Sequence, residues 1–244
     1  MTSETAPPEW IAAHRAVWDA KPGLRKYYEK EYFERIAAAM PSGRSCELGS
    51  GPGFFTDYHR CTVVTDISPS AHIDRQVDVH QLPFDDESFS AVVGIDVFHH
   101  FENPMTALGE ISRVLIPTGK LILIEPWTTW VGRLFYKHVH HEDCFPISEP
   151  ESAAFPKGKD PMDGNAAIPR TYLETLRETV TGRFGFSIEV CEKFGLAAYL
   201  STGGFTKLST PAVITDICLA IDKITPGALR NVISLKAFIV ASKC

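Results

Sequence analysis

The chain has 244 residues, with 24 Lys and Arg against 30 Asp and Glu, which gives a net charge of −6. A chain of this length and ordinary composition, 44% hydrophobic and 22% charged, can bury one sizeable core, which excludes a disordered or fibrous protein. The acidic balance argues against general binding to nucleic acids or anionic membranes, and no apolar run approaches the roughly 18 residues of a membrane span.

The N-terminal segment and the cysteines indicate a cellular compartment. The first ten residues, MTSETAPPEW, lack the basic and apolar regions of a signal peptide. The six cysteines have no CxxC spacing, and we expect them to be reduced thiols of the core. We therefore expect a cytoplasmic protein.

The first half of the chain alternates between helical and strand-like segments. Apolar residues at helical spacing over residues 10–40, broken at Pro22-Gly23, predict two helices. Strand-like runs follow at residues 44–48, 62–66, 91–96 and 120–125. Such alternation is typical of a parallel sheet covered by helices on both faces.

Helix boundary signals are clearest over residues 103–115. Asn103 can cap this helix, Pro104 suits its first position, and residues 117–119 predict its end in a turn. Residues 127–181 lose the regular pattern except for a predicted helix near residues 171–180, so we expect a functional insertion there. Strands are predicted again at residues 187–194 and 235–241, with a helix at 215–224.

A glycine-rich loop joins the first predicted strand to the next helix, with the sequence CELGSGPGFF over residues 46–55. Its glycines allow tight turns and a close ligand approach, at the strand end where open α/β sheets bind ligands. The spacing Gly49-x-Gly51-x-Gly53, followed by Phe54, differs from the GxGxxG fingerprint of dinucleotide sites.

Acidic residues beside this loop indicate the charge of the ligand. Glu47 would repel a pyrophosphate but suits a cation, and Asp66 at the end of the second strand can accept hydrogen bonds from ribose hydroxyls. A nucleoside that carries a positively charged amino-acid tail fits this description.

The chain resembles the class I S-adenosylmethionine-dependent methyltransferases, in particular the small-molecule enzymes with a type 11-like domain. The resemblance depends on four ordered motifs: CELGSGPG, VVTDIS, VDVHQLPFDDESFSAVVGIDVFHHFENP and EISRVLIPTGKLILIEPW. It implies an α/β fold with a doubly wound, mostly parallel, seven-stranded Rossmann-like sheet. We further expect a methyltransferase domain over residues 41–244 with a substrate-cap insertion after the fifth strand at about residues 127–181. The N-terminal helices over residues 1–40 could form a lid over the cofactor, or their aromatic residues could belong to the core.

The resemblance also implies S-adenosylmethionine as cofactor and assigns residues to each part of it. Glu47 would anchor the methionine ammonium, and Asp66 would bind the ribose. The methionine portion would be wrapped by Gly49, Ser50, Gly51 and Gly53, and the adenine would be bound by Ile67, Asp78 and the backbone of Val79. Asp96 would lie beside the sulfonium and the acceptor.

The acceptor side is less defined by the sequence. His99 or His100 could act as the general base for a hydroxyl acceptor, with Asp96 nearby, but both histidines could also be packing residues. His140, His141 and Arg170, within the expected insertion, could bind the acceptor. Residues 136–144 form a cluster of metal-ligand types that could bind Zn²⁺ or a transition metal, but they lack regular metal-ligand spacing. We assign no metal site from the sequence, and metal binding by this cluster stays open.

We therefore expect methyl transfer to an oxygen of a small organic acceptor, without nucleic-acid or membrane partners. Transfer to nitrogen or carbon stays open, as do the acceptor and the oligomeric state. A cofactor-binding cyclase or isomerase is the main alternative. An NAD-dependent reductase and a binding protein with a degenerate site are further alternatives, which the glycine spacing and the intact acidic residues disfavour.

Overall fold

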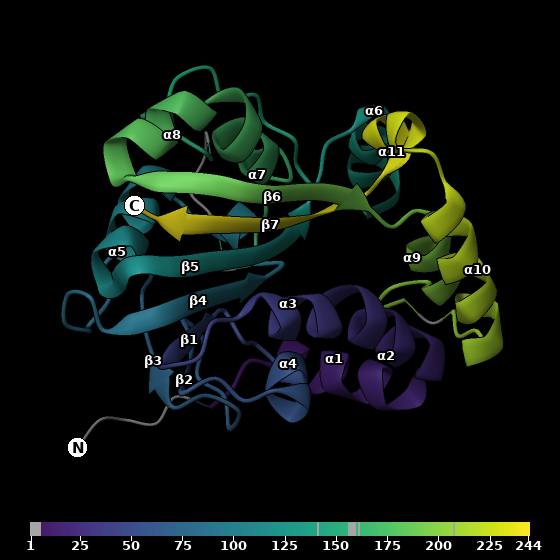
Figure 1. Ribbon diagram of the computed structural model, residues 1–244. Helices are drawn as coiled ribbons and strands as arrows, with labels where there is room; N and C mark the ends of the chain where they lie inside the picture. The colour runs from purple at the N-terminus through teal and green to yellow at the C-terminus, as the bar shows by residue number, and fades with distance from the viewer. Residues whose placement is uncertain (1–5, 141, 156–159, 161, 207) are drawn as a thin grey trace.

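A seven-stranded sheet with the strand order β3-β2-β1-β4-β5-β7-β6 forms the centre of the computed structural model (Figure 1). The structure describes residues 6–140, 142–155, 160, 162–206 and 208–244. The strands are β1 (Ser45–Leu48), β2 (Val63–Asp66), β3 (Arg75–Gln76), β4 (Phe89–Ile95), β5 (Leu115–Pro126), β6 (Phe186–Phe194) and β7 (Lys236–Lys243). β7 runs antiparallel to both of its neighbours, and the other pairs are parallel. The predicted α/β fold with a mostly parallel seven-stranded sheet is confirmed.

The predicted strands agree with the observed ones except at two places. β3 is only two residues long, too short to give a pattern in the sequence. β5 begins at Leu115 and includes residues 117–119, where we expected a turn. The turn prediction was wrong because Leu115 already pairs with Phe89, and an irregularity in the pairing between Phe89 and Ala91 accommodates Thr118 at a φ of +64°.

Two apolar cores lie on opposite faces of the sheet. Successive residues of the central strands alternate between them: Val92 and Leu121 belong to one core, and Val93 and Ile122 to the other. Helices α5 (Pro104–Val114) and α8 (Arg177–Phe184) cover the first face, and α3 (Glu34–Ala39) and α4 (Phe54–Tyr58) cover the second (Figure 1). The Asn103 side chain caps α5 as predicted, by accepting a hydrogen bond from the Thr106 N–H.

The N-terminal helices pack on the second face. They comprise α1 (Glu9–Ala20), α2 (Pro22–Tyr28), a π-helical segment η1 (Glu29–Phe33) and α3. The chain breaks at Lys21, and Pro22 is the first residue of α2, as the sequence predicted. η1 joins α2 to α3 without a break in the helical path, so the region forms two helical rods.

The second half of the chain adds helices at the end of the sheet where the parallel strands finish. These are α6 (Trp130–Phe135), the π-helical η3 (Tyr136–His140), α7 (Ile168–Arg170), the π-helical η4 (Thr171–Thr175), α9 (Ala197–Thr202), α10 (Ala212–Ile224) and α11 (Gly227–Ile233). α10 packs against both α9 and α2, so this part of the chain lies beside the N-terminal helices (Figure 1). The sequence predicted α10 but not α9 or α11.

The cysteines are free, but three of them lie outside the core. Cys46 and Cys61 are buried, Cys191 and Cys244 are exposed, and the remaining two are half-buried. The prediction of core thiols was therefore wrong for Cys144, Cys191 and Cys244, whereas Cys218 packs against the second core. In the described ranges, we find no helix with the length and apolar character needed to cross a membrane.

Candidate functional site

A cavity of about 540 Å³ opens at the carboxyl ends of β1, β2 and β4. Its wall contains the glycine loop, the residues that follow β2 and β4, and the short 3₁₀ helix η2 (Phe98–His100). α1 adds Trp10 and His14 to this wall, and α2 adds Tyr28. The cavity therefore lies at the sheet edge where open α/β sheets bind ligands, and the N-terminal helices border it.

The glycine loop approaches the cavity with its backbone. Gly49 and Gly51 have φ angles of +64° and +51°, which glycine adopts without strain. A Cβ atom on Gly49 would lie 2.1 Å from Val97 Cγ2, so no side chain fits there. Gly53 differs from these two glycines in its position. It caps the start of α4 with a φ of +77°, and it does not line the cavity.

Glu47 presents a buried carboxyl group to the cavity. Its Oε2 atom accepts a hydrogen bond of 3.0 Å from the Thr56 hydroxyl. Burial raises the pKa of Glu47 to about 7, although the Thr56 hydrogen bond opposes this shift. The buried Ser50 hydroxyl, also in the wall, lies beside this carboxyl group and likewise opposes the rise in its pKa. This end of the cavity therefore suits a cationic ligand with polar groups.

Asp66 is fixed by the backbone on either side of it. Its Oδ2 accepts a 2.7 Å hydrogen bond from the Gly51 N–H, and its Oδ1 accepts one of 2.7 Å from the Ser68 N–H. Burial raises the pKa of Asp66, and these hydrogen bonds oppose the rise. Each carboxylate oxygen can accept a further hydrogen bond, which leaves capacity for two ribose hydroxyls. Ile67, next in the chain, lines the cavity with an exposed side chain.

Asp78 and Val79 form the adjoining part of the wall. The backbone N–H of His80 donates to Asp78 Oδ1 at 2.9 Å, and the His80 ring Nδ1 lies 2.7 Å from the same atom. Burial opposes ionisation of Asp78, but these contacts outweigh it and lower the pKa. The carboxylate is therefore charged and held at the rim.

These residues fit S-adenosylmethionine better than a dinucleotide. The carboxyl groups of Glu47, Asp66 and Asp78, the Ser50 hydroxyl and the backbone of the glycine loop line this end of the cavity. Lys236 is the only Lys or Arg among the described residues that line the cavity, and it lies at the other end, beside Asp96. A pyrophosphate would face acids here, whereas a cationic nucleoside meets complementary charge.

At that other end, Asp96 and Lys236 form an ion pair. Asp96 follows β4 with a φ of +50°, and its Oδ1 lies 2.5 Å from the Lys236 Nζ of β7. Burial opposes the charged form of Lys236, but Asp96 outweighs it and raises the pKa. The Nζ atom also lies 5.9 Å and 5.6 Å from the ring centroids of Tyr136 and Tyr199. Asp96 was predicted from the sequence, whereas Lys236 was not.

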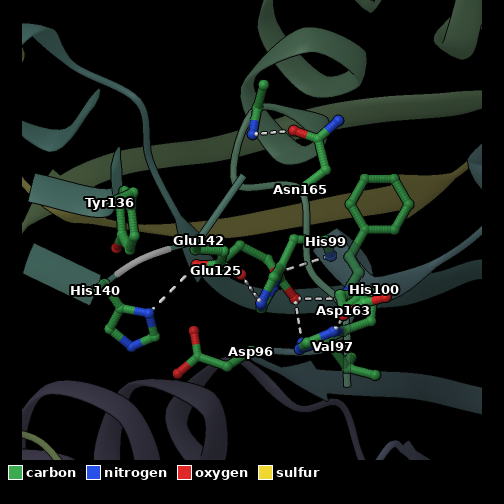
Figure 2. A network of polar contacts seen from close by, with 12 residues as sticks. Asp96, Val97, His99, His100, Glu125, Tyr136, His140, Glu142, Asp163 and Asn165 are labelled. Carbon is green, nitrogen blue, oxygen red and sulfur yellow. Dashed lines mark hydrogen bonds and ion pairs between the residues drawn. The ribbon is translucent and has the colours of Figure 1, made fainter. Parts of the chain in front are cut away.

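His99 is held between two carboxylates, as Figure 2 shows. Its Nδ1 lies 2.8 Å from Glu125 Oε2, and its Nε2 lies 2.9 Å from Glu142 Oε1. Burial opposes protonation of His99, but the two carboxylates outweigh it and raise the pKa to about 10. The same contact lowers the pKa of Glu142 to about 2 against the effect of burial. His99 was a candidate from the sequence, whereas its partners Glu125 and Glu142 were not.

The remaining predicted acceptor residues are only partly brought together. His100 and His140 line the cavity, and the His100 Nδ1 lies 3.0 Å from the Asp163 carbonyl oxygen. Arg170 does not line it, because its guanidinium donates to Glu174 and to the Thr128 carbonyl oxygen. His141 lies outside the described residues.

Comparison with known proteins gives a match in sequence to one domain family. Residues 46–123 match the family model of a methyltransferase domain. A human protein named "Probable tRNA methyltransferase 9B" is 31% identical over 155 residues, which are 57% of this chain and 30% of that protein. The chain thus spans about a third of the length of the curated relatives that it matches first.

Solved structures with the same fold cover nearly the whole chain. A Thermotoga maritima protein, described as an S-adenosylmethionine-dependent methyltransferase and possible histamine N-methyltransferase, superposes with a TM-score of 0.55 at 16% identity. The superposition covers 97% of this chain and 94% of that one. An Archaeoglobus fulgidus methyltransferase gives a TM-score of 0.52 at 15% identity, over 90% of this chain and 94% of that one. At these identities the likeness shows the fold alone.

Proposed function

We propose that the chain is a class I S-adenosylmethionine-dependent methyltransferase with a type 11-like domain, a proposal supported by the match of residues 46–123 to the family model of a methyltransferase domain. From this premise we propose that it transfers the methyl group to an oxygen atom of a small organic acceptor. The observation that carries the choice of oxygen is the buried Lys236 ammonium paired with Asp96 at the cavity wall.

The residues at the glycine-loop end would hold the cofactor. Glu47 lines the cavity with a buried carboxyl group that suits the methionine ammonium, and Asp66 has acceptor capacity for the ribose. The backbone of Gly49, Ser50 and Gly51 suits the methionine portion, and Ile67, Asp78 and Val79 lie where the adenine is expected. When bound, S-adenosylmethionine supplies an activated methyl group whose leaving group is a neutral thioether. The protein then has to position the acceptor in line and exclude water.

Lys236 favours oxygen over nitrogen as the nucleophile. An ammonium group has three N–H donors, and Asp96 takes only one of them. A hydroxyl oxygen has two lone pairs, so it can accept a hydrogen bond from Lys236 and still attack the methyl group. A neutral amine has one lone pair, and a protonated amine would be repelled by the Lys236 charge.

A base other than His99 has to accept the proton that the acceptor hydroxyl loses. Both ring nitrogens of His99 lie within 2.9 Å of carboxylate oxygens, so neither offers a lone pair to an acceptor. Asp96 lies directly beside Lys236, and His100 and His140 also line the cavity. We propose Asp96 as the base because its Oδ1 lies 2.5 Å from the Lys236 Nζ that would hold the acceptor oxygen.

The proposal is tested by supplying S-adenosylmethionine with a ¹³C-labelled methyl group and a panel of phenols, sugars, hydroxy acids, amines and tRNA. We expect equal amounts of S-adenosylhomocysteine and an O-methylated small molecule, identified by the ¹³C shift of the new methyl group. Lys236→Met should lose turnover and retain cofactor affinity, and Lys236→Arg should recover part of the rate.

Other products would contradict the proposal in distinguishable ways. An N-methylated amine as the product would contradict the proposal that Lys236 favours an oxygen nucleophile. Methylated tRNA, the acceptor class in the name of one relative, would reject a small-molecule acceptor. A rearranged substrate without S-adenosylhomocysteine would indicate the cyclase or isomerase alternative.

A further inference from the structure

Three potential metal ligands converge on one wall of the cavity. His99 and His100 come from the loop after β4, and Glu142 comes from the segment that follows η3 (Figure 2). One ligand atom from each residue lies within 4.8 Å of the other two. Two imidazoles and one carboxylate are a common donor set for divalent transition metals in proteins.

Both histidines are anchored in the way that metal-bound histidines are. A histidine ligand donates its second ring N–H to a carboxylate or carbonyl oxygen, which fixes the tautomer and the ring orientation. The His99 Nδ1 lies 2.8 Å from Glu125, and the His100 Nδ1 lies 3.0 Å from the Asp163 carbonyl oxygen. Glu125 is itself fixed, because it is fully buried and accepts hydrogen bonds from the Val97 and Phe98 N–H groups.

The surrounding loop fits closely around these groups. A Cβ atom on Gly164 would lie 2.1 Å from Glu142 Oε1 and 2.8 Å from His99 Cδ2, so only glycine fits there. The Asn165 N–H donates to the His99 carbonyl oxygen at 2.9 Å, which fastens the loop to η2. The ligand atoms are therefore held in place by the fold.

We propose that His99, His100 and Glu142 form a binding site for a divalent transition metal such as Zn²⁺. The ion would displace the proton that lies between His99 Nε2 and Glu142 Oε1. These two atoms are 2.9 Å apart, close to the roughly 3.0–3.4 Å that separates neighbouring ligand atoms bound at about 2.1 Å to one ion. All three residues line the cavity, so the remaining coordination positions would face it, as in zinc sites with three protein ligands. A role of the ion in holding the acceptor oxygen would rest on the proposed function, whereas metal binding itself does not.

Metal binding is measured by calorimetry and by equilibrium dialysis of the full chain after treatment with a chelator, with Zn²⁺ and with Co²⁺ as a spectroscopic probe. We expect one ion per chain and a Co²⁺ absorption spectrum of nitrogen and oxygen ligands. His100→Ala and Glu142→Gln should abolish or strongly weaken binding. Glu125→Gln, which alters only the anchor of His99, should lower the affinity by about 10–100-fold. His138→Ala is the matched control, because His138 is exposed and does not line the cavity. This variant should bind the metal with the affinity of the wild type.

Two results would overturn the site. The first is wild-type protein that binds no ion, which would make His99 a protonated link between Glu125 and Glu142. The second is binding that His100→Ala and Glu142→Gln leave unchanged, with a thiolate spectrum that indicates the exposed Cys191 or Cys244. Circular dichroism of each variant identifies any that fails to fold. If Glu142→Gln does not fold, His100→Ala still tests the site, because His100 is only half-buried. S-adenosylmethionine binding by the chelator-treated protein tests the proposed function separately.

Discussion

The substitution Glu47→Gln should stabilise the ligand-free protein at alkaline pH and weaken its hold on the cofactor. Burial raises the pKa of Glu47 from 4.5 to about 7. The folded state therefore holds this proton more tightly than the unfolded state. The contribution of the protonated Glu47 to the free energy of unfolding is fully present below about pH 4.5, and it is lost as the pH rises through the pKa of the folded state.

The size of the effect follows from the pKa difference. Each pKa unit corresponds to about 1.4 kcal/mol, so ionised Glu47 costs the folded state about 3 kcal/mol above its folded pKa. Glutamine cannot ionise and avoids this cost. The difference in unfolding free energy between Glu47→Gln and wild type should therefore grow by about 2–3 kcal/mol from about pH 5 to about pH 8.

Urea denaturation of both proteins at the two pH values measures this difference. Glu102→Gln is a matched control, because Glu102 also lines the cavity but is exposed. We expect no such change with pH in the control. By calorimetry, Glu47→Gln should bind S-adenosylmethionine about 10-fold or more weakly, since a charged hydrogen-bond partner contributes about 1.5–3 kcal/mol. A difference in stability that does not change with pH, or an unchanged cofactor affinity, would refute this account of Glu47.

Three further substitutions test other parts of the cavity. Asp66→Asn should weaken S-adenosylmethionine binding by about 1–3 kcal/mol in calorimetry, and an unchanged affinity would remove Asp66 from the site. Lys236→Met and Asp96→Asn should each lower the unfolding free energy by about 1–3 kcal/mol. The double variant should lose less than the sum of the two single losses, and additive losses would show that the two side chains do not interact. Gly164→Ala should lower the unfolding free energy by about 1–3 kcal/mol through its overlap with Glu142, and an unchanged melting temperature would contradict the close packing described.

The local parts of the site could be predicted from the sequence because its signals lie within short segments. The glycine loop follows a strand directly, and Asp66 ends the next one. Parallel strands bring their carboxyl ends to the same edge, so these residues meet in the fold as their order predicts. The alternation of Val92 and Val93 between two cores follows from the same strand geometry.

The contacts made by distant segments could not be predicted in this way. Lys236 reaches Asp96 across 140 residues of sequence, because β7 enters the sheet antiparallel beside β5. Glu142 reaches His99 from an irregular segment that has no helical or strand period. Each partner is an ordinary charged residue in the sequence, and only the fold gives it a specific partner. Arg170 was expected to bind the acceptor, but it pairs with Glu174 one helical turn away.

The central claim is that the cavity at the ends of β1 and β2 binds S-adenosylmethionine, and calorimetric titration of the purified chain tests it most directly. The account predicts one S-adenosylmethionine or S-adenosylhomocysteine per chain, with binding weakened by Asp66→Asn, and no binding of NADH. Tight binding of NADH, or no binding of either sulfur nucleoside, would contradict it.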